Sequence, residues 1–257
     1  MPIRRTKEFT RGFWCFFRGL ALIFTRLGLF KYAAMPLLVN TLLFIGFFLT
    51  FNTLVYHLSG WLFTQGDQAW YWMAAKGMFA LLMFVISLIA ALFSFVAVGL
   101  VIAGPFNDLL SAAVERRLTG AVRETGEAFT AMTLRTVKNE TRKAAVFLSI
   151  QGALFLLNFI PVGGSAMFMV LNPLFIAFVM AYEFTGYALD RRGLTFGEKQ
   201  GYLLNRTALT FGFGAAVGVT MLIPFVHFLL MPAAAAGGTL LIIEREAEET
   251  APRTRKE

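Results

Sequence analysis

The segment just before the first long apolar stretch carries groups that suit a small oxyanion. Arg26 and Lys31 supply positive charge, and Gly28, between them, lets the backbone approach a ligand closely. A helix beginning here would add free N–H groups and the positive end of its dipole, which favour an anion. A second interpretation stays open, because basic residues also flank membrane helices simply as a signal of orientation.

A second set of polar residues follows the Gly-Pro pair at 104–105. Asn107 and Asp108 lie where an apolar helix is expected to end and an amphipathic one to begin, and Glu115 follows two turns later. A channel mouth or gate requires fixed polar groups of this kind. The same Asn-Asp pair is expected to cap the next helix. Asn40, inside the first apolar stretch, is expected either to bond between helices or to line a pore.

Groups for enzyme or cofactor chemistry are scarce. The chain has one cysteine, Cys15, and two histidines, His57 and His227, in different apolar segments. The sequence contains no Cys-x-x-Cys pair, no metal-ligand cluster and no phosphate-binding glycine loop. We therefore expect no enzyme activity, no catalytic residues, no metal and no cofactor.

The composition indicates a membrane protein. Of the 257 residues, 58% are hydrophobic and 15% charged, whereas soluble proteins average about 25% charged residues. The mean hydropathy is +0.68, and the chain has 29 phenylalanines, too much apolar surface for a disordered or collagen-like chain in water. The net charge of +8 is concentrated in residues 1–31, so a nucleic-acid partner is not expected.

Four stretches contain no charged residue, and each exceeds the roughly 18 to 20 apolar residues that cross a bilayer. They are residues 32–66, 77–107, 144–182 and 207–243. The first two, within 32–107, are expected to be continuous transmembrane helices. The first should open at Pro36, and the second should end at the Gly-Pro pair 104–105.

The last two stretches are interrupted by proline and glycine, at 159–164 and at Ile223-Pro224, and therefore predict two helical hairpins. Each hairpin either spans the membrane as two short helices or re-enters with its turn buried against protein, and we favour re-entry. The Gly-x-x-x-Gly motif at Gly214 and Gly218 predicts close helix packing in the second hairpin.

Amphipathic segments flank these stretches. In residues 1–31, aromatic residues recur every three or four positions beside Arg11 and Arg18, which predicts an interfacial helix rather than a cleaved signal peptide. Residues 108–143 predict cytoplasmic amphipathic helices, and residues 244–257 predict a charged tail. The whole chain is expected to form a single all-α membrane domain.

The distribution of Lys and Arg predicts the orientation. Seven lie in 1–31, seven in 108–143, four in 183–206 and four in 244–257, against Lys76 alone in 57–76. The positive-inside rule therefore places both termini in the cytoplasm and the connection 57–76 outside.

Several motifs, taken in order, resemble the CysZ sulfate permease family, over Gly12 to Ile243. They are Pro36-Leu-Leu-Val-Asn40, Gly104-Pro-Phe-Asn107, Arg117-Leu-Thr-Gly120, the breaks at Ile160-Pro161 and Ile223-Pro224, and Phe228-Leu-Leu-Met-Pro232. The resemblance implies inner-membrane uptake of sulfate for bacterial cysteine synthesis, without an ATPase. It also implies two spanning helices, two hemi-penetrating hairpins and a homo-oligomer with antiparallel protomers, whereas the charge distribution favours one orientation.

The family's sulfate-binding motif is Gly-Leu-Arg-Arg before the first spanning helix, and it corresponds here to Gly28, Leu29, Phe30 and Lys31. Phe30 and Lys31 replace the two arginines. Neither side chain can form the two parallel hydrogen bonds that a guanidinium group makes to an oxyanion. Arg26 is expected to compensate.

Two hypotheses follow from these patterns. The leading one is a channel-like permease, in the lipid bilayer, for sulfate or a related oxyanion. Its conducting path is expected to involve Asn40, Asn107, Asp108 and Glu115. The alternative is a membrane-shaping or scaffold protein whose hairpins and amphipathic helix act as wedges in one leaflet.

Overall fold

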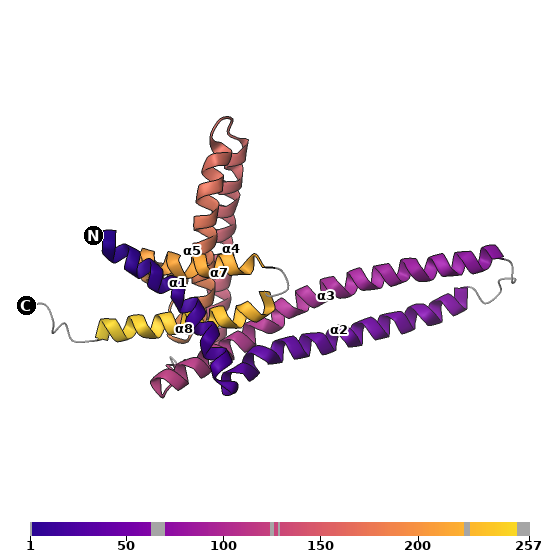
Figure 1. Ribbon diagram of the computed structural model, residues 1–257, viewed down its shortest axis with the longest axis horizontal. Coiled ribbons are helices and arrows are strands. Elements are labelled where there is room, and N and C mark those ends of the chain that lie inside the picture. The colour runs from indigo at the N-terminus through magenta and orange to yellow at the C-terminus, as the bar shows by residue number, and fades with distance from the viewer. Residues whose placement is uncertain (1, 63–69, 124–125, 128, 224–226, 251–257) are drawn as a thin grey trace, which may run out of the picture. The chain divides into compact units, whose positions relative to one another are not determined.

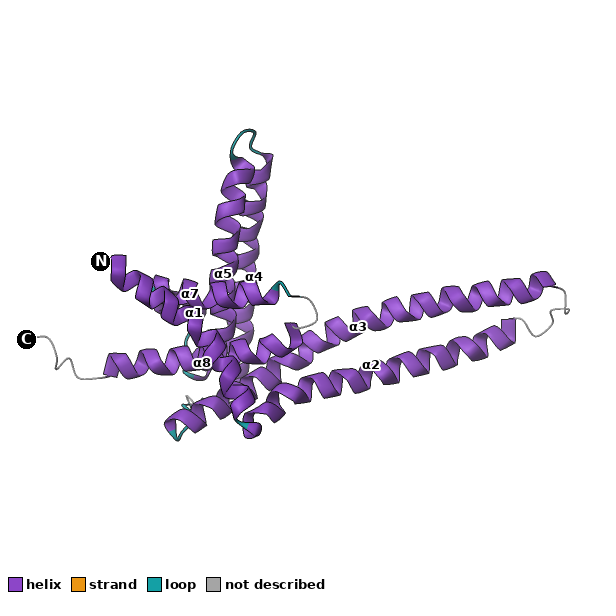
Figure 2. Ribbon diagram, viewed as in Figure 1, coloured by secondary structure: helices purple, strands orange, loops and turns teal. Residues whose placement is uncertain are grey.

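The computed structural model describes residues 2–62, 70–123, 126–127, 129–223 and 227–250. Within these ranges the regular structure is helical and no strand occurs (Figure 2), which confirms the expected all-α class. The elements are α1 (Pro2–Thr25), α2 (Leu27–Leu62), α3 (Trp70–Thr119), α4 (Phe129–Leu156), a 3-10 turn (Leu157–Phe159), α5 (Gly164–Arg191), α6 (Phe196–Leu204), α7 (Thr207–Met221) and α8 (His227–Thr250), as labelled in Figure 1.

The chain forms two compact units. One comprises Ala34–Phe106, and the other comprises Met1–Ala33 together with Asn107–Glu257. Helices α2 and α3 each contribute to both units, since the boundaries fall inside them. The expectation of a single membrane domain stays a prediction.

The unit of residues 34–106 consists of the long apolar parts of α2 and α3. The two helices contact one another through aromatic side chains, with Phe44 edge-on to Phe95 at 5.7 Å between ring centroids and Phe48 edge-on to Phe84 at 6.1 Å. Most of their other apolar side chains are exposed. Among the described residues, the segments Gly28–Trp61, Trp70–Phe95 and Gly164–Arg191 are long and apolar enough to cross a membrane.

Both α2 and α3 continue through prolines that were expected to bound them. Helix α2 begins at Leu27, so Pro36 lies inside it, and α3 continues past Pro105. The predicted ends were therefore wrong, as was the predicted cap, because Asn107 and Asp108 lie within α3. A proline inside a helix leaves a carbonyl without its amide partner, and membrane helices tolerate this because neighbouring groups can satisfy it.

The two hairpins lie in the second unit. Helix α4 ends at Leu156, and α5 begins at Gly164, directly after Gly163, whose φ of 106° is in the left-handed region that favours glycine. This confirms the break predicted at 159–164, and Figure 1 shows α4 and α5 side by side.

The second hairpin is formed by α7, which ends at Met221, and α8, which begins at His227. The predicted break at Ile223 therefore falls between the helices, while Pro224 lies outside the described residues. Helix α8 continues to Thr250, so the predicted tail is helical over its first half.

Helix α1 packs against α7 and α8. Its Cys15 and Phe16 are fully buried in the core of this unit. The backbones approach closely at Gly12, where an added methyl group would overlap the carbonyl oxygen of Leu209. The predicted interfacial helix is thus covered by protein on one face.

Other sides of α1 stay exposed and carry both aromatic and basic side chains, such as Trp14 and Arg18. Phe9, Trp14 and Phe24 are 41%, 56% and 52% exposed. Some aromatic residues of 1–31 are therefore buried against protein and others are exposed. Their spacing could not show which, because a helix with apolar residues on more than one side can be covered by protein or by lipid.

Candidate functional site

The predicted oxyanion segment forms the corner between α1 and α2. Arg26 lies between the two helices, and its carbonyl oxygen accepts hydrogen bonds from the amides of Leu29 at 2.8 Å and Phe30 at 3.3 Å. The Leu29 side chain is 3% exposed and belongs to the core, which anchors the corner. Gly28 and Lys31 are exposed and lie three residues apart on one helix, so they share a face.

A residue from the end of α3 lies beside this corner. A Cβ atom added at Gly28 would lie 3.9 Å from Nη1 of Arg117, with no other neighbouring group within 4 Å. Arg117 is exposed. The surface above Gly28 is therefore flanked by a guanidinium group from a distant part of the chain. From the residues alone, the one feature that distinguishes Arg117 from Arg116 as a site residue is that Arg117 begins a motif shared with the resembled family.

The charges at this corner are not neutralised within the part of the chain that the structure describes. Arg26, Lys31 and Arg117 form no ion pair with a described carboxylate. By contrast, Arg18 binds Glu244 at 2.6 Å between Nη2 and Oε1. The Lys31 Nζ lies 5.0 Å from the centroid of the adjacent Tyr32 ring, a cation–π distance.

This arrangement suits an oxyanion. Arg26 and Lys31 flank Gly28 along the chain, and Arg117 approaches it through space. Unpaired cations, a helix start and a glycine that admits close approach all favour bound negative charge. Phe30, which replaces one family arginine, is instead 38% exposed and packs against Phe24.

The first proposed pore residue, Asn40, lies in the unit of residues 34–106. Its side-chain amide is 2% exposed and donates to the carbonyl oxygen of Phe95 at 2.9 Å, so it bonds from α2 to α3. Its Oδ1 is buried and has no hydrogen-bond partner in the described structure. A cavity of about 250 Å³ adjoins it, lined also by Leu43, Phe44, Phe47, Ser94, Phe95 and Val98. The expected interhelical bond is present, and pore lining stays a prediction.

The other three proposed pore residues, Asn107, Asp108 and Glu115, lie on α3 in the second unit. Asn107 is 3% exposed and is a hydrogen-bond partner of the Tyr187 side chain. Asp108 accepts a hydrogen bond from Nη1 of Arg191 at 2.6 Å. Both residues thus face α5.

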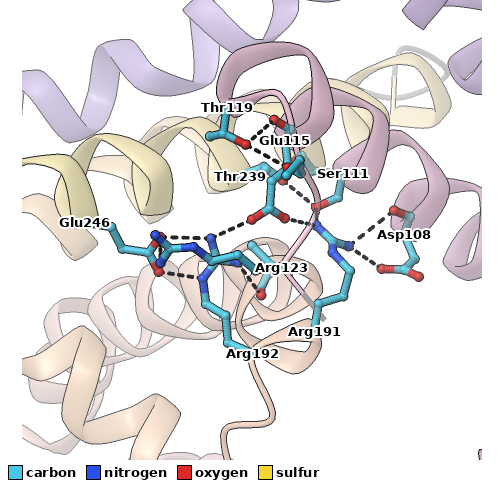
Figure 3. A network of polar contacts seen from close by, with 12 residues as sticks. Asp108, Ser111, Glu115, Thr119, Arg123, Arg191, Arg192, Thr239 and Glu246 are labelled. Atoms are coloured by element: carbon cyan, nitrogen blue, oxygen red, sulfur yellow. Dashed lines mark hydrogen bonds and ion pairs between the residues drawn. The ribbon is translucent and has the colours of Figure 1, made fainter. Parts of the chain in front are cut away.

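Glu115 is the buried centre of an ion-pair network. Its side chain is 1% exposed and accepts from Nη2 of Arg191 at 3.2 Å and Nη2 of Arg192 at 2.9 Å (Figure 3). Arg192 also binds Glu246 on α8, at 2.5 Å between Nε and Oε1. Glu246 in turn binds Nη1 of Arg123 at 3.2 Å. The carboxylate of Glu115 is therefore compensated by two guanidinium groups, and its role in a gate stays a prediction.

Comparison with known proteins agrees with the resemblance. A family model described as Sulfate transporter CysZ/Etoposide-induced protein 2.4 matches residues 15–232. This chain belongs to that family. Members named Sulfate transporter CysZ include those of Pseudomonas syringae pv. tomato, 31% identical over 91% of this chain and 92% of its own length, and of Pseudomonas fluorescens, 33% identical over 90% and 92%. The Pseudomonas aeruginosa protein of that name is 33% identical over 90% and 93%.

Membership in the CysZ family and the long apolar helices make this chain a membrane protein. The CysZ relatives are named as transporters, not enzymes, and nothing in their names favours the membrane-shaping hypothesis. None of these comparisons tests the individual site residues, so the corner residues Arg26, Gly28, Leu29 and Lys31 remain predictions.

Proposed function

We propose that this protein is a channel-like permease for sulfate or a closely related oxyanion. The observation that carries the proposal is the α1–α2 corner. There Arg26 and Lys31 flank an exposed glycine along the chain and Arg117 approaches it, and none of the three pairs with a carboxylate in the described chain. The CysZ relatives, named as sulfate transporters, supply the identity of the anion.

The corner binds the anion at the end of α2 that the predicted orientation places on the cytoplasmic side. Lys31 contributes a point charge, whereas Arg117 contributes a planar guanidinium that can form two parallel hydrogen bonds to an oxyanion. Arg117, which lies on α3, therefore replaces the arginine that the family motif has at the position of Phe30. Arg26 adds charge on the other side of Gly28, and Leu29 fixes the corner to the core.

The conducting path involves Asn40, Asn107, Asp108 and Glu115. An uncompensated carboxylate would repel a divalent anion by several kcal/mol at low dielectric. Pairing with Arg191 and Arg192 removes this obstacle for Asp108 and Glu115. No nucleotide-binding motif is present in the sequence, so flux follows the gradient or is coupled to an ion.

The protein functions in the bacterial inner membrane, with both termini in the cytoplasm, and supplies sulfate for cysteine synthesis. The orientation is supported by the Lys and Arg residues, of which seven lie in 1–31, seven in 108–143, four in 183–206 and four in 244–257, against one in 57–76. Several copies assemble, because α2 and α3 present apolar surface on nearly all sides, which further copies and lipid can cover.

Uptake of radiolabelled sulfate into proteoliposomes tests the proposal. We expect uptake well above that of empty vesicles, and a marked loss in Lys31→Ala. The matched control is Lys138→Ala, because Lys138 is exposed on α4 and forms no ion pair with a described carboxylate. Uptake equal to that of empty vesicles would exclude the permease, and unchanged uptake in Lys31→Ala would exclude the proposed corner.

A further inference from the structure

The first turns of α1 and the corner between α6 and α7 enclose a basic cavity, separate from the α1–α2 corner. Its volume is about 320 Å³, within the range of roughly 300 to 1,000 Å³ that small-molecule sites occupy. It is lined by Arg4, Arg5, Glu8, Asn205 and Arg206, three guanidinium groups against one carboxylate. This lining suits an anion.

The helices that hold these side chains are fixed to one another. Gly212 on α7 contacts the backbone of Phe9 so closely that an added methyl group would overlap its carbonyl oxygen, and Gly12 on α1 meets Leu209 in the same way. These contacts lie within about one to two turns of Arg5 and Arg206. The two walls of the cavity are thereby held in place by backbone contact rather than by flexible side chains.

The three arginines differ in how far they are neutralised. Arg206 binds Glu248 at 2.5 Å between Nη1 and Oε2. Arg4 binds Glu8 at 3.3 Å, but its side chain is 80% exposed, so this pair is weak. Arg5 forms no ion pair with any carboxylate in the described chain. Arg5 is therefore the guanidinium that is available to a ligand.

The start of α7 adds to this charge. Arg206 occupies its N-cap position, and no side chain caps this end. The first-turn amides of a helix carry partial positive charge and favour an anion. Because Asn205 and Arg206 line the cavity, this helix end lies beside it and adds to the positive charge of Arg5.

The surface beside the cavity narrows the class of ligand. The outer face of α1, away from the buried Cys15 and Phe16, exposes Trp14 and Phe24 beside the basic side chain of Arg18. Tryptophan and arginine together are typical of the membrane–water interface, where each basic residue gains about 1 kcal/mol from anionic lipid. We propose that the cavity binds the phosphate of an anionic phospholipid headgroup while the outer face of α1 lies in the lipid interface. Inorganic phosphate shares the charge but has no chains to contact that face.

Native mass spectrometry of the full-length protein in detergent tests this site. Phosphatidylglycerol and phosphatidylcholine are titrated separately, and we expect phosphatidylglycerol to bind more tightly. Arg5→Gln should weaken phosphatidylglycerol binding about fivefold, from the loss of one basic contact. The matched control is Lys7→Gln, which removes the same charge from the same exposed turn but does not line the cavity, and it should change binding less than about twofold.

Three results would overturn the proposal. Equal retention of the two lipids by the wild-type protein would exclude selectivity for an anionic headgroup, and this comparison needs no variant. Equal weakening in Arg5→Gln and Lys7→Gln would indicate general attraction rather than a site. Inorganic phosphate or sulfate binding as tightly as phosphatidylglycerol, with the same dependence on Arg5, would assign the cavity to a free anion. Sulfate flux is not part of the readout, so failure here leaves the permease proposal standing.

Discussion

Arg117 lies beside the segment in which this chain has Phe30 instead of a family arginine. Its Nη1 approaches the open side of Gly28, whereas Phe30 turns towards Phe24 and leaves no cation at its own position. A hydrogen bond to a charged partner contributes about 1.5 to 3 kcal/mol, and 1.4 kcal/mol corresponds to a factor of ten. We therefore expect the guanidinium of Arg117 to offset much of the charge that Phe30 does not supply.

Replacing Arg117 with glutamine should lower sulfate flux at least about tenfold, because one charge-assisted contact to the anion is lost. The measurement is the initial rate of sulfate uptake into proteoliposomes at subsaturating sulfate. Arg116→Gln is the control, since Arg116 is the adjacent residue on α3, is also exposed and has no described ion pair. If both variants lose flux equally, the effect is one of general charge and Arg117 has no special role.

Cys15 should be chemically inert in the folded protein. It is fully buried, and this burial, followed by the nearby charge of Glu244, raises the pKa of its thiol to about 11. Because the thiolate is the reactive form, the thiol stays protonated and unreactive across pH 7 to 9. We expect no labelling by N-ethylmaleimide in mild detergent and full labelling after denaturation in SDS. Rapid labelling of the native protein, or a labelling rate that levels off between pH 7 and 9 as it does for a thiol of ordinary pKa, would contradict the burial of α1 against α8.

At the level of helices, contacts between α5 and α7 depend on one glycine of the predicted packing motif. A methyl group added at Gly214 would overlap the carbonyl oxygen of Ala177 on α5. At Gly218 the nearest group is Cγ2 of Ile176, at 3.9 Å, which is ordinary van der Waals contact. The two glycines of the motif therefore differ in how closely a neighbouring helix approaches them, although the motif alone does not distinguish them.

Gly214→Ala should accordingly destabilise the protein by about 1 to 3 kcal/mol, the usual cost of overpacking, while Gly218→Ala should be tolerated. Thermal unfolding of the purified variants in one detergent measures the difference. Equal melting temperatures for the two variants would show that α5 and α7 are not held at this distance.

The ion-pair network joins three helices of the larger unit, and the side chains at its centre, Glu115, Arg191 and Arg192, are 1%, 6% and 9% exposed. Glu115 comes from α3, Arg191 from the end of α5 and Glu246 from α8, as Figure 3 shows. Removing one partner of a buried ion pair leaves uncompensated charge in a medium of low dielectric, which is more costly than the loss of an exposed pair. The fold of this unit therefore depends on Glu115 whether or not Glu115 also serves a gate.

Glu115→Gln should lower the free energy of unfolding by about 3 to 5 kcal/mol. Glu127→Gln, which removes the more exposed pair between Glu127 and Arg135, should cost at most about 1 kcal/mol. Both values can be measured from denaturant or thermal unfolding of the whole protein. Similar losses in the two variants would contradict the burial of Glu115.

The sequence determined the class of this protein and suggested the corner that we propose as its site. Charged residues are absent from four long stretches because bilayer lipid cannot solvate them, so an all-α membrane chain follows from residue types alone. The break at 159–164 was predictable for a similar reason, since proline and glycine act on the backbone locally. The corner residues Arg26, Gly28 and Lys31 were identifiable because they adjoin one another in the chain.

Only the tertiary structure decided which charges remain available and where the helices end. Prolines 36 and 105 lie inside helices because surrounding contacts outweigh a local preference to break. Arg18 is neutralised by Glu244 and Glu115 by Arg191, whereas Arg117, which pairs with no carboxylate in the described chain, is brought beside Gly28. These pairings join residues far apart in the sequence, and electrostatic interaction depends on separation in space, which residue spacing along a chain does not record.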